Sequence, residues 1–234
     1  MDNFVKENER VDDLQLNGLV IIQNPGKFLF GIDAVMLSDF ATVAKGERAL
    51  DLGTGTGVIP ILLSAKGRGS YYAGVDIQEE MVDMARRSVA LNVSCGALVK
   101  GTVEIEVGDL RDLSGTYKPS SFDLITCNPP YIKAGEGLVN ETDARAVSRH
   151  EIACTLADVV CAAARLLRPG GRFAMVHKPH RLAECFELMR LYGLEPKRLR
   201  FVHATVHKEP SLCLIEATRG GGAFLKVMPP IIIG

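Results

Sequence analysis

The chain has 234 residues, of which 47% are apolar and 24% are charged, as is usual for one or two soluble globular domains. No apolar run is long enough to cross a membrane, and the acidic, polar N-terminus excludes a secretory signal peptide. Six cysteines without a Cys-x-x-Cys pair indicate reduced core thiols in a cytoplasmic protein, and we expect no metal site.

The net charge of −1 conceals a basic segment. Residues 165–208 contain 10 Lys or Arg and 3 Asp or Glu, a local charge of +7. The rest of the chain contains the other 17 basic and 25 acidic residues, a local charge of −8. The segment is either a surface that faces a polyanion or a set of charges scattered over both sides of a sheet, and both interpretations stay open.

The first 47 residues predict a small extension that packs on a larger domain. Residues 1–14 are charged and indicate a loosely held arm. The segment 14–22 predicts a β-hairpin, because Asn17-Gly18 stands between two apolar runs. Asp33 is a candidate N-cap for a helix over residues 34–41. We expect this extension to lie over the end of a sheet.

From residue 48 to residue 234 the pattern alternates between short apolar strands and amphipathic helices. Strands are predicted at 49–52, 72–76, 103–107, 122–127, 173–176, 200–203 and 212–217. Helices are predicted at 57–65, 79–91, 155–167 and 182–191. The last two strands leave no room for a helix between them, so they pair antiparallel. The predicted fold class is α/β, a Rossmann-like, doubly wound, mostly parallel seven-stranded sheet with an antiparallel edge strand.

A glycine-rich loop, Asp51-Leu52-Gly53-Thr54-Gly55-Thr56-Gly57, joins the first strand of this domain to its helix. Glycines there permit a tight turn and the close approach of a ligand to backbone N–H groups. The spacing is G-x-G-x-G, and Val58 stands where a dinucleotide fold has its third glycine. The carboxylate of Asp51 suits a ligand with an ammonium group better than it suits a pyrophosphate.

Carboxylates also follow the next two strands. Asp76 closes the second strand, where a carboxylate can bind both hydroxyls of a ribose, and Asp109 follows the third, where it could meet an adenine amine. Each of these three carboxylates also has an ordinary alternative role, namely a turn cap for Asp51, a helix N-cap for Asp76 and a loop contact for Asp109. Because parallel strands end at one edge of a sheet, we expect all three to line one ligand site.

The fourth strand ends in Asn128-Pro129-Pro130-Tyr131. Two prolines remove two backbone donors and stiffen the chain, and Pro129 biases Asn128 away from the helical region. The result is a rigid rim with an amide side chain, exposed carbonyls and an aromatic ring, which suits a planar group carrying an NH2. The alternative is a plain strand terminator, since Asn and Pro often end strands.

With this loop and this rim, the chain resembles the class I S-adenosyl-L-methionine-dependent methyltransferases, whose amino-methylating members carry an Asn-Pro-Pro-Tyr signature. More closely, it is similar to the valine-tRNA adenine-N6 methyltransferases, which modify the adenine beside the anticodon. Residues 28–37, 51–57 and 128–131 carry the similarity, and residues 145–151 and 169–171 extend it. It covers nearly the whole chain, and the front segment is less specific for the substrate.

The resemblance implies S-adenosyl-L-methionine as cofactor, no metal, and a nucleic acid, above all a tRNA, as partner. Hydrogen bonds from both N–H groups of the target amine to the Asn128 side-chain oxygen and the Pro129 carbonyl would free the nitrogen lone pair. Tyr131 would stack on the base, which stabilises by about 1–3 kcal/mol. A tRNA anticodon loop suits this mechanism, because its bases leave the stack easily.

The resemblance also implies the residues of each subsite. Cofactor contacts fall on Asp51, Gly53, Gly55, Gly57, Asp76, Ile77, Asp109, Leu110 and Asn128. Substrate contacts fall on Pro130, Tyr131, Arg145, Arg149 and Lys178. The alternative for the two arginines is a junction between a loop and a helix with local ion pairs. Lys178 ends the fifth strand together with the candidate phosphate contacts His177, His180 and Arg181.

Other functions share part of this pattern. A protein glutamine-N5 methyltransferase of the release-factor-modifying type uses the same motif but usually carries an N-terminal helical domain, whereas only 47 residues precede the first strand here. Adenine or guanine methylation in DNA or rRNA is a second alternative, and the recognition domain usual for DNA is missing. A non-catalytic cofactor- or RNA-binding module is the third, and the intact motif speaks against it. The oligomeric state is not predicted.

Overall fold

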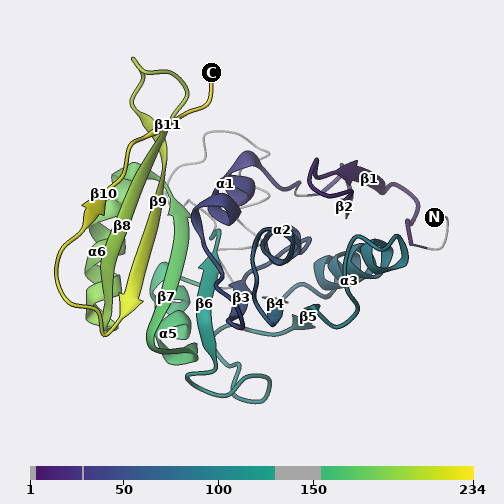
Figure 1. The fold of residues 1–234 in the computed structure, drawn as a ribbon, viewed down its shortest axis with the longest axis horizontal. Helices are drawn as coiled ribbons and strands as arrows, with labels where there is room; N and C mark the ends of the chain where they lie inside the picture. The colour runs from purple at the N-terminus through teal and green to yellow at the C-terminus, as the bar shows by residue number, and fades with distance from the viewer. Residues whose placement is uncertain (1–3, 28, 130–153) are drawn as a thin grey trace.

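A mixed β-sheet runs through the molecule, and helices cover both of its faces (Figure 1). The computed structural model describes residues 4–27, 29–129 and 154–234. The strands of the sheet are β3 (Arg48–Leu52), β4 (Tyr71–Asp76), β5 (Val103–Val107), β6 (Phe122–Cys127), β7 (Leu167–His177), β8 (Leu194–His203), β9 (Pro210–Arg219), β10 (Lys226–Val227) and β11 (Ile231–Ile232). Their order is β10-β8-β9-β7-β6-β3-β4-β5, and β11 also pairs with β8.

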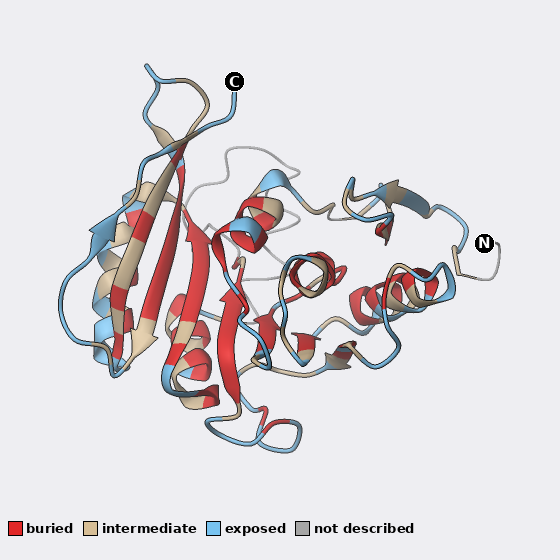
Figure 2. Cartoon of the chain, in the orientation of Figure 1, coloured by how far each residue is buried: buried red, intermediate tan, exposed pale blue. Residues whose placement is uncertain are grey.

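The helices form two layers with a core on each side of the sheet. They are α1 (Ile32–Phe40), α2 (Val58–Lys66), α3 (Glu79–Ser94), α5 (Leu156–Leu166) and α6 (Leu182–Leu191), with the short 3-10 helix η1 (Pro179–Arg181) before α6. Leu124 belongs to the core under α1, α2 and α3, whereas its neighbour Ile125 belongs to the core under α5 and α6. Because both faces are covered, every residue of β6 is buried (Figure 2).

The predicted fold class is confirmed, but the antiparallel strand does not lie at the edge. Strand β9 pairs antiparallel with both β7 and β8, so β8 lies outside it and runs parallel to β7. Residues 212–217 of β9 are buried without interruption, whereas β8 alternates between buried and partly exposed residues. The short strands β10 and β11 pair in parallel with the outer side of β8.

The N-terminal hairpin and its turn are confirmed, but its first strand precedes the predicted segment 14–22: the strands are β1 (Arg10–Asp13) and β2 (Val20–Gln23). Asn17 and Gly18 form the turn with φ values of 52° and 73°. The prediction of a loose arm over residues 1–14 is wrong for the described part, from residue 4 onward. Phe4 and Val5 pack against a small core beside α3, Glu9 forms a nearly buried ion pair with Arg87 of α3, and β1 pairs with β2.

Two side chains of α3, Asn92 and Ser88, form hydrogen bonds with the backbone of β2. The side-chain oxygen of Asn92 accepts a hydrogen bond from the Val20 N–H at 2.9 Å, and its amide nitrogen donates to the Val20 carbonyl at 2.7 Å. The Ser88 hydroxyl accepts from the Ile22 N–H at 2.9 Å. These bonds satisfy the backbone of β2 and fasten the hairpin to α3.

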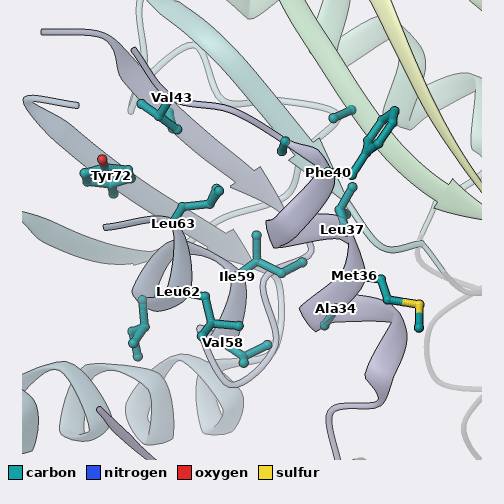
Figure 3. Packing of buried hydrophobic residues seen from close by; sticks show 14 of the residues in the cluster. Ala34, Met36, Leu37, Phe40, Val43, Val58, Ile59, Leu62, Leu63 and Tyr72 are labelled. Carbon is teal, nitrogen blue, oxygen red and sulfur yellow. The ribbon is translucent and has the colours of Figure 1, made fainter. Parts of the chain in front are cut away.

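Helix α1 packs against α2 through apolar side chains, among them Leu37 and Phe40 of α1 and Ile59 of α2 (Figure 3). Its N-cap is Gly31, and the predicted cap Asp33 lies inside the first turn, where its carboxylate accepts from the Ala34 N–H. The extension therefore supports the helix that follows the glycine loop. None of the helices in the described ranges is both long and apolar enough to span a lipid bilayer.

Candidate functional site

The register of the parallel strands brings the predicted site residues to one edge of the sheet. Asp51 of β3 is paired with Thr126 of β6 on one side and with Gly74 of β4 on the other. Asp76, at the end of β4, is paired with Val107 at the end of β5. The glycine loop, the Asn-Pro rim and the segment that carries Asp109 therefore leave neighbouring strands at their carboxyl ends, where open α/β sheets bind ligands.

The glycine loop uses its own backbone donors internally. The φ values are 70° at Gly53, 54° at Gly55 and 79° at Gly57. The N–H groups of Gly53 and Thr54 donate to the Val75 carbonyl at 2.9 and 3.0 Å, and that of Gly55 donates to an Asp76 oxygen at 2.9 Å. These three N–H groups are therefore not available to a ligand, and the predicted approach of a ligand to the N–H groups at the start of α2 stays a prediction. A loop bonded in this way is a poor phosphate site.

The glycine loop nevertheless permits a ligand to approach its backbone closely. A Cβ atom on Gly53 would have no described atom within 4 Å, so no described residue fills the space in front of it. On Gly74 of β4, by contrast, a Cβ atom would lie 2.7 Å from the Thr54 hydroxyl, so this glycine makes room for the loop. Gly74 was not a predicted site residue, and the G-V-D sequence that closes the strand is the signal for it.

Asp51 is a buried carboxylate, and one of its oxygens has no hydrogen-bond partner among the described residues. It is 1% exposed, and its Oδ1 accepts a hydrogen bond from the Thr126 hydroxyl at 2.6 Å. Its Oδ2 is buried and forms no hydrogen bond with the described residues. Burial raises the pKa of Asp51 to about 7, although the hydroxyls of Thr126 and Thr54 lower it. A buried carboxylate oxygen without a described partner, beside the glycine loop, fits the ammonium group of a ligand.

Asp76 is held in a fixed orientation and keeps acceptor capacity. Its Oδ2 accepts from the Gly55 N–H, and its Oδ1 accepts from the Gln78 N–H at 2.9 Å. The N-cap of α3 is Gln78, so Asp76 is not the cap itself. A carboxylate has about four acceptor sites, which leaves room for ribose hydroxyls. The neighbouring Ile77 is 44% exposed and offers an apolar surface beside Asp76.

Asp109 is engaged by a nearby guanidinium. Nε of Arg111 lies 2.9 Å from both carboxylate oxygens, and the Arg111 N–H bonds the same side chain. This ion pair keeps the pKa of Asp109 below its usual range. The loop-stabilising role is therefore present, and an adenine contact stays a prediction. Leu110 is half-buried and packs against the core under α5.

The rim is described as far as its second residue. Asn128 is partly exposed at the end of β6, and Pro129 after it is buried. Pro130, Tyr131, Arg145 and Arg149 lie outside the described residues. The hydroxyl that bonds Asp51 belongs to Thr126, which lies two residues before Asn128, the first residue of the rim. Thr126 was not predicted, although a hydroxyl inside the apolar run 122–127 is a visible signal.

Two of the candidate phosphate contacts at and after the end of β7 contradict expectation. His177 is fully buried, so it is not available to a phosphate. Its Nδ1 accepts from the Lys178 N–H at 2.8 Å, and burial lowers the pKa of His177 to about 4. Arg181 is also buried and pairs with Glu184. Lys178 is partly exposed at the same edge, so its predicted contact stays open.

The basic segment 165–208 is largely neutralised within the molecule. Its ion pairs are Arg168–Asp123, Arg172–Glu47, Arg181–Glu184, Arg190–Glu195 and Arg198–Glu216. Lys197 and Arg200 donate to backbone carbonyls of the C-terminal segment. Scattered, paired charges therefore describe it better than a polyanion surface. In the described ranges no cluster of three or more His, Cys, Asp or Glu could hold a metal, and all six cysteines are free.

Comparisons with known proteins identify a family for the chain. A family model described as a methyltransferase domain matches residues 44–207. A curated relative from Porphyromonas gingivalis, named tRNA1(Val) (adenine(37)-N6)-methyltransferase, is 32% identical over 190 residues, which are 80% of this chain and 72% of the relative.

Among solved structures, a protein from Agrobacterium tumefaciens described as a predicted O-methyltransferase has a TM-score of 0.69 at 19% identity, with 86% of each chain covered. A geranyl diphosphate methyltransferase in complex with SAM has a TM-score of 0.56 at 16% identity, with 80% of this chain and 84% of that chain covered. At these identities the two structures show the fold alone.

Proposed function

The chain belongs to the methyltransferase family that includes the tRNA1(Val) (adenine(37)-N6)-methyltransferases, and we propose that it methylates the exocyclic N6 of an adenine in a tRNA anticodon loop. The methyl donor in this proposal is S-adenosyl-L-methionine, which supplies an electrophilic methyl group on a positively charged sulfur. Residues 48–234 would form the transferase domain, and residues 1–47 would support it.

One observation carries the proposal: the glycine loop and the Asn-Pro rim leave adjacent, paired parallel strands in the same register. The last pair between β3 and β6 is Leu52 with Cys127, so Gly53 and Asn128 come next on each strand. A methyl donor bound along the loop would therefore lie beside an amine bound at the rim. Direct transfer needs this proximity, because the attacking nitrogen must line up with the breaking bond.

The carboxylates along the edge would bind the donor. The open oxygen of Asp51 would pair with the ammonium group of its amino-acid part, and Asp76 would accept hydrogen bonds from the ribose hydroxyls. The exposed side chain of Ile77 and the half-buried Leu110 would contact the adenine ring, and Asp109 its amine. Burial strengthens the pairing with Asp51, because little water screens a contact there.

The rim would bind and activate the target amine. The Asn128 side-chain oxygen and the Pro129 carbonyl would accept hydrogen bonds from its two N–H groups, drawing the nitrogen lone pair out of conjugation with the ring. As the nitrogen–carbon bond forms, the carbon–sulfur bond breaks, and the surplus proton of the alkylated nitrogen leaves to water. Pro130, Tyr131, Arg145, Arg149 and Lys178 are proposed as substrate contacts on the family pattern.

Incubation with methyl-labelled S-adenosyl-L-methionine and separate pools of total tRNA, total rRNA and soluble protein tests the proposal. We expect label in tRNA, recovered as N6-methyladenosine after digestion to nucleosides. A synthetic anticodon stem-loop should accept label, and the same stem-loop with guanine in place of its loop adenines should not. Label in the protein pool alone would overturn the tRNA assignment in favour of amide methylation.

A further inference from the structure

Thr126 connects the two halves of the site through a side-chain bond that no motif requires. It is fully buried in β6, and its hydroxyl lies 2.6 Å from Oδ1 of Asp51 on the neighbouring strand. The two residues are direct partners in the register of β3 and β6. Because Oδ1 is engaged by Thr126, the oxygen left open is Oδ2. The hydroxyl thus decides which oxygen of Asp51 is left for a ligand.

Burial and a nearby negative charge favour the neutral form of Asp51, whereas hydrogen bonds from hydroxyl groups favour its ionised form. The carboxylate is buried, and Asp76 on β4 adds a second negative charge nearby. The thiol of Cys127, on β6, is also buried and stays protonated, because burial raises its pKa. The hydroxyls of Thr126 and Thr54 are the groups that act in the opposite direction. A neutral Asp51 would lose the charge that attracts an ammonium group.

We propose that Thr126 is a positioning residue for the methyl donor: by bonding Oδ1 of Asp51, it orients the carboxylate so that Oδ2 binds the ammonium group of the donor's amino-acid part. This inference rests on the proposed function, since it concerns the same cofactor site. It differs from a packing role, because it predicts an effect that depends on pH and on the ligand's charge.

Binding calorimetry of the full chain tests the inference without any turnover. The ligands are S-adenosylhomocysteine, which has the amino-acid part, and 5′-methylthioadenosine, which lacks it, each titrated from about pH 5 to about pH 8. For the native protein, the affinity for S-adenosylhomocysteine should rise with pH as Asp51 ionises and then level off. The affinity for 5′-methylthioadenosine should stay flat.

Thr126→Val keeps the shape of the side chain and removes the donor. It should weaken S-adenosylhomocysteine binding about tenfold at neutral pH and move the rise in affinity upward by about one pH unit, because a hydrogen bond to a charged group is lost. Thr126→Ser keeps the hydroxyl and should restore the native profile. Binding of 5′-methylthioadenosine should be unchanged in both variants, which also reports that they fold.

The outcomes separate this inference from the proposed function. If the native protein binds S-adenosylhomocysteine but Thr126→Val keeps the native pH profile, the positioning role is overturned and the proposed function stands. Equal weakening of both ligands at every pH would also overturn it, in favour of simple packing. If the native protein binds neither ligand at any pH, the proposed function itself fails.

Discussion

The Thr126 hydroxyl lies 2.6 Å from the Asp51 carboxylate, so the strand that ends in the Asn-Pro rim is bonded by its side chains to the strand that opens the glycine loop. Both side chains are buried, and their strands are paired in parallel. The relative position of the loop and the rim is therefore set by the rigid centre of the sheet. Site geometry built on rigid elements is better preserved than geometry built on loops alone.

Replacing Asn128 should separate binding from transfer. Asn128→Ala removes the proposed acceptor for the target amine, and we expect methyl transfer to fall by about 10²–10³-fold, as when one preorganised polar group is removed from an active site. S-adenosylhomocysteine affinity, measured by calorimetry, should change little. Asn24→Ala, in the turn after β2, is a control that should leave both unchanged. Lost binding together with full turnover would contradict the assigned role.

Asp51 should make the protein less stable as the pH rises. Its pKa is about 7 in the folded state, against about 4 in an unfolded chain, so the folded state holds a proton that the unfolded state has released. The free energy of unfolding should therefore fall from about pH 4 to about pH 7 and then stay level. The hydrogen bond with Arg87 lowers the pKa of Glu9, so the stability that this carboxylate contributes is lost only at lower pH, when it becomes protonated.

Asp51→Asn should abolish that fall, because an amide does not ionise. The variant should be more stable than the native protein at pH 8, by on the order of 3 kcal/mol, and should bind S-adenosylhomocysteine more weakly. Urea denaturation at several pH values measures the stability. Identical pH profiles for the two proteins would show that Asp51 is ionised at a much lower pH than the structure indicates.

Three glycine substitutions should separate backbone strain, crowding and ligand exclusion. Gly53, Gly57 and Gly96 all have φ between 70° and 79°, so alanine strains each by about 1–2 kcal/mol. At Gly57 the added Cβ would also lie 3.0 Å from the Ala85 Cβ, whereas at Gly53 and Gly96 no described atom lies within 4 Å. Gly57→Ala should therefore give the lowest Tm of the three.

Gly53→Ala and Gly96→Ala should have similar Tm values but different binding. The methyl group at position 53 enters the open space in front of the glycine loop, so only Gly53→Ala should weaken S-adenosylhomocysteine binding. Gly96 lies beyond the end of α3 and serves as the matched control for strain. Equal affinities for the two variants would remove Gly53 from the proposed cofactor site.

Asn92→Ala should loosen the N-terminal hairpin. The change leaves the Val20 N–H and carbonyl without their side-chain partner, which costs about 2 kcal/mol in the free energy of unfolding. Hydrogen exchange of the Val20 amide should accelerate at the same time. Ser94→Ala, in the last turn of the same helix, removes a hydroxyl that bonds the Leu91 carbonyl and contacts the Cys95 thiol but not β2, and it is the control. Unchanged exchange at Val20 would mean that the hairpin is held by other contacts.

Local sequence patterns predicted those strands and helices whose ends are determined by neighbouring residues. The strands at 103–107 and 122–127 and the helix at 182–191 have the predicted bounds, because turn residues or a change of period mark both ends. The predicted position of the antiparallel strand at the edge of the sheet was wrong, because the order of strands depends on which faces are covered. Strands β10 and β11 were not predicted, since a segment of two residues forms a strand only where it can pair with the exposed edge of another strand.

The candidate site was likewise predicted only in part. The residues at the strand ends come to one edge as predicted, because parallel pairing requires it. The internal use of the Gly53 and Gly55 donors was missed, since it depends on contacts with β4. The ion pairs that neutralise the basic segment were also beyond the sequence, because Arg168 and Arg172 meet their partners on β6 and before β3.

The C-terminal segment has a practical consequence for handling the protein. Strands β10 and β11 and the Arg200 contact with the Pro229 carbonyl cover the outer edge of β8 between residues 198 and 203. A chain truncated before residue 222 would leave the backbone donors and acceptors of that edge unpaired, ready to join with strands of other molecules. Chains shortened at this end should therefore aggregate at concentrations where the full chain stays dispersed.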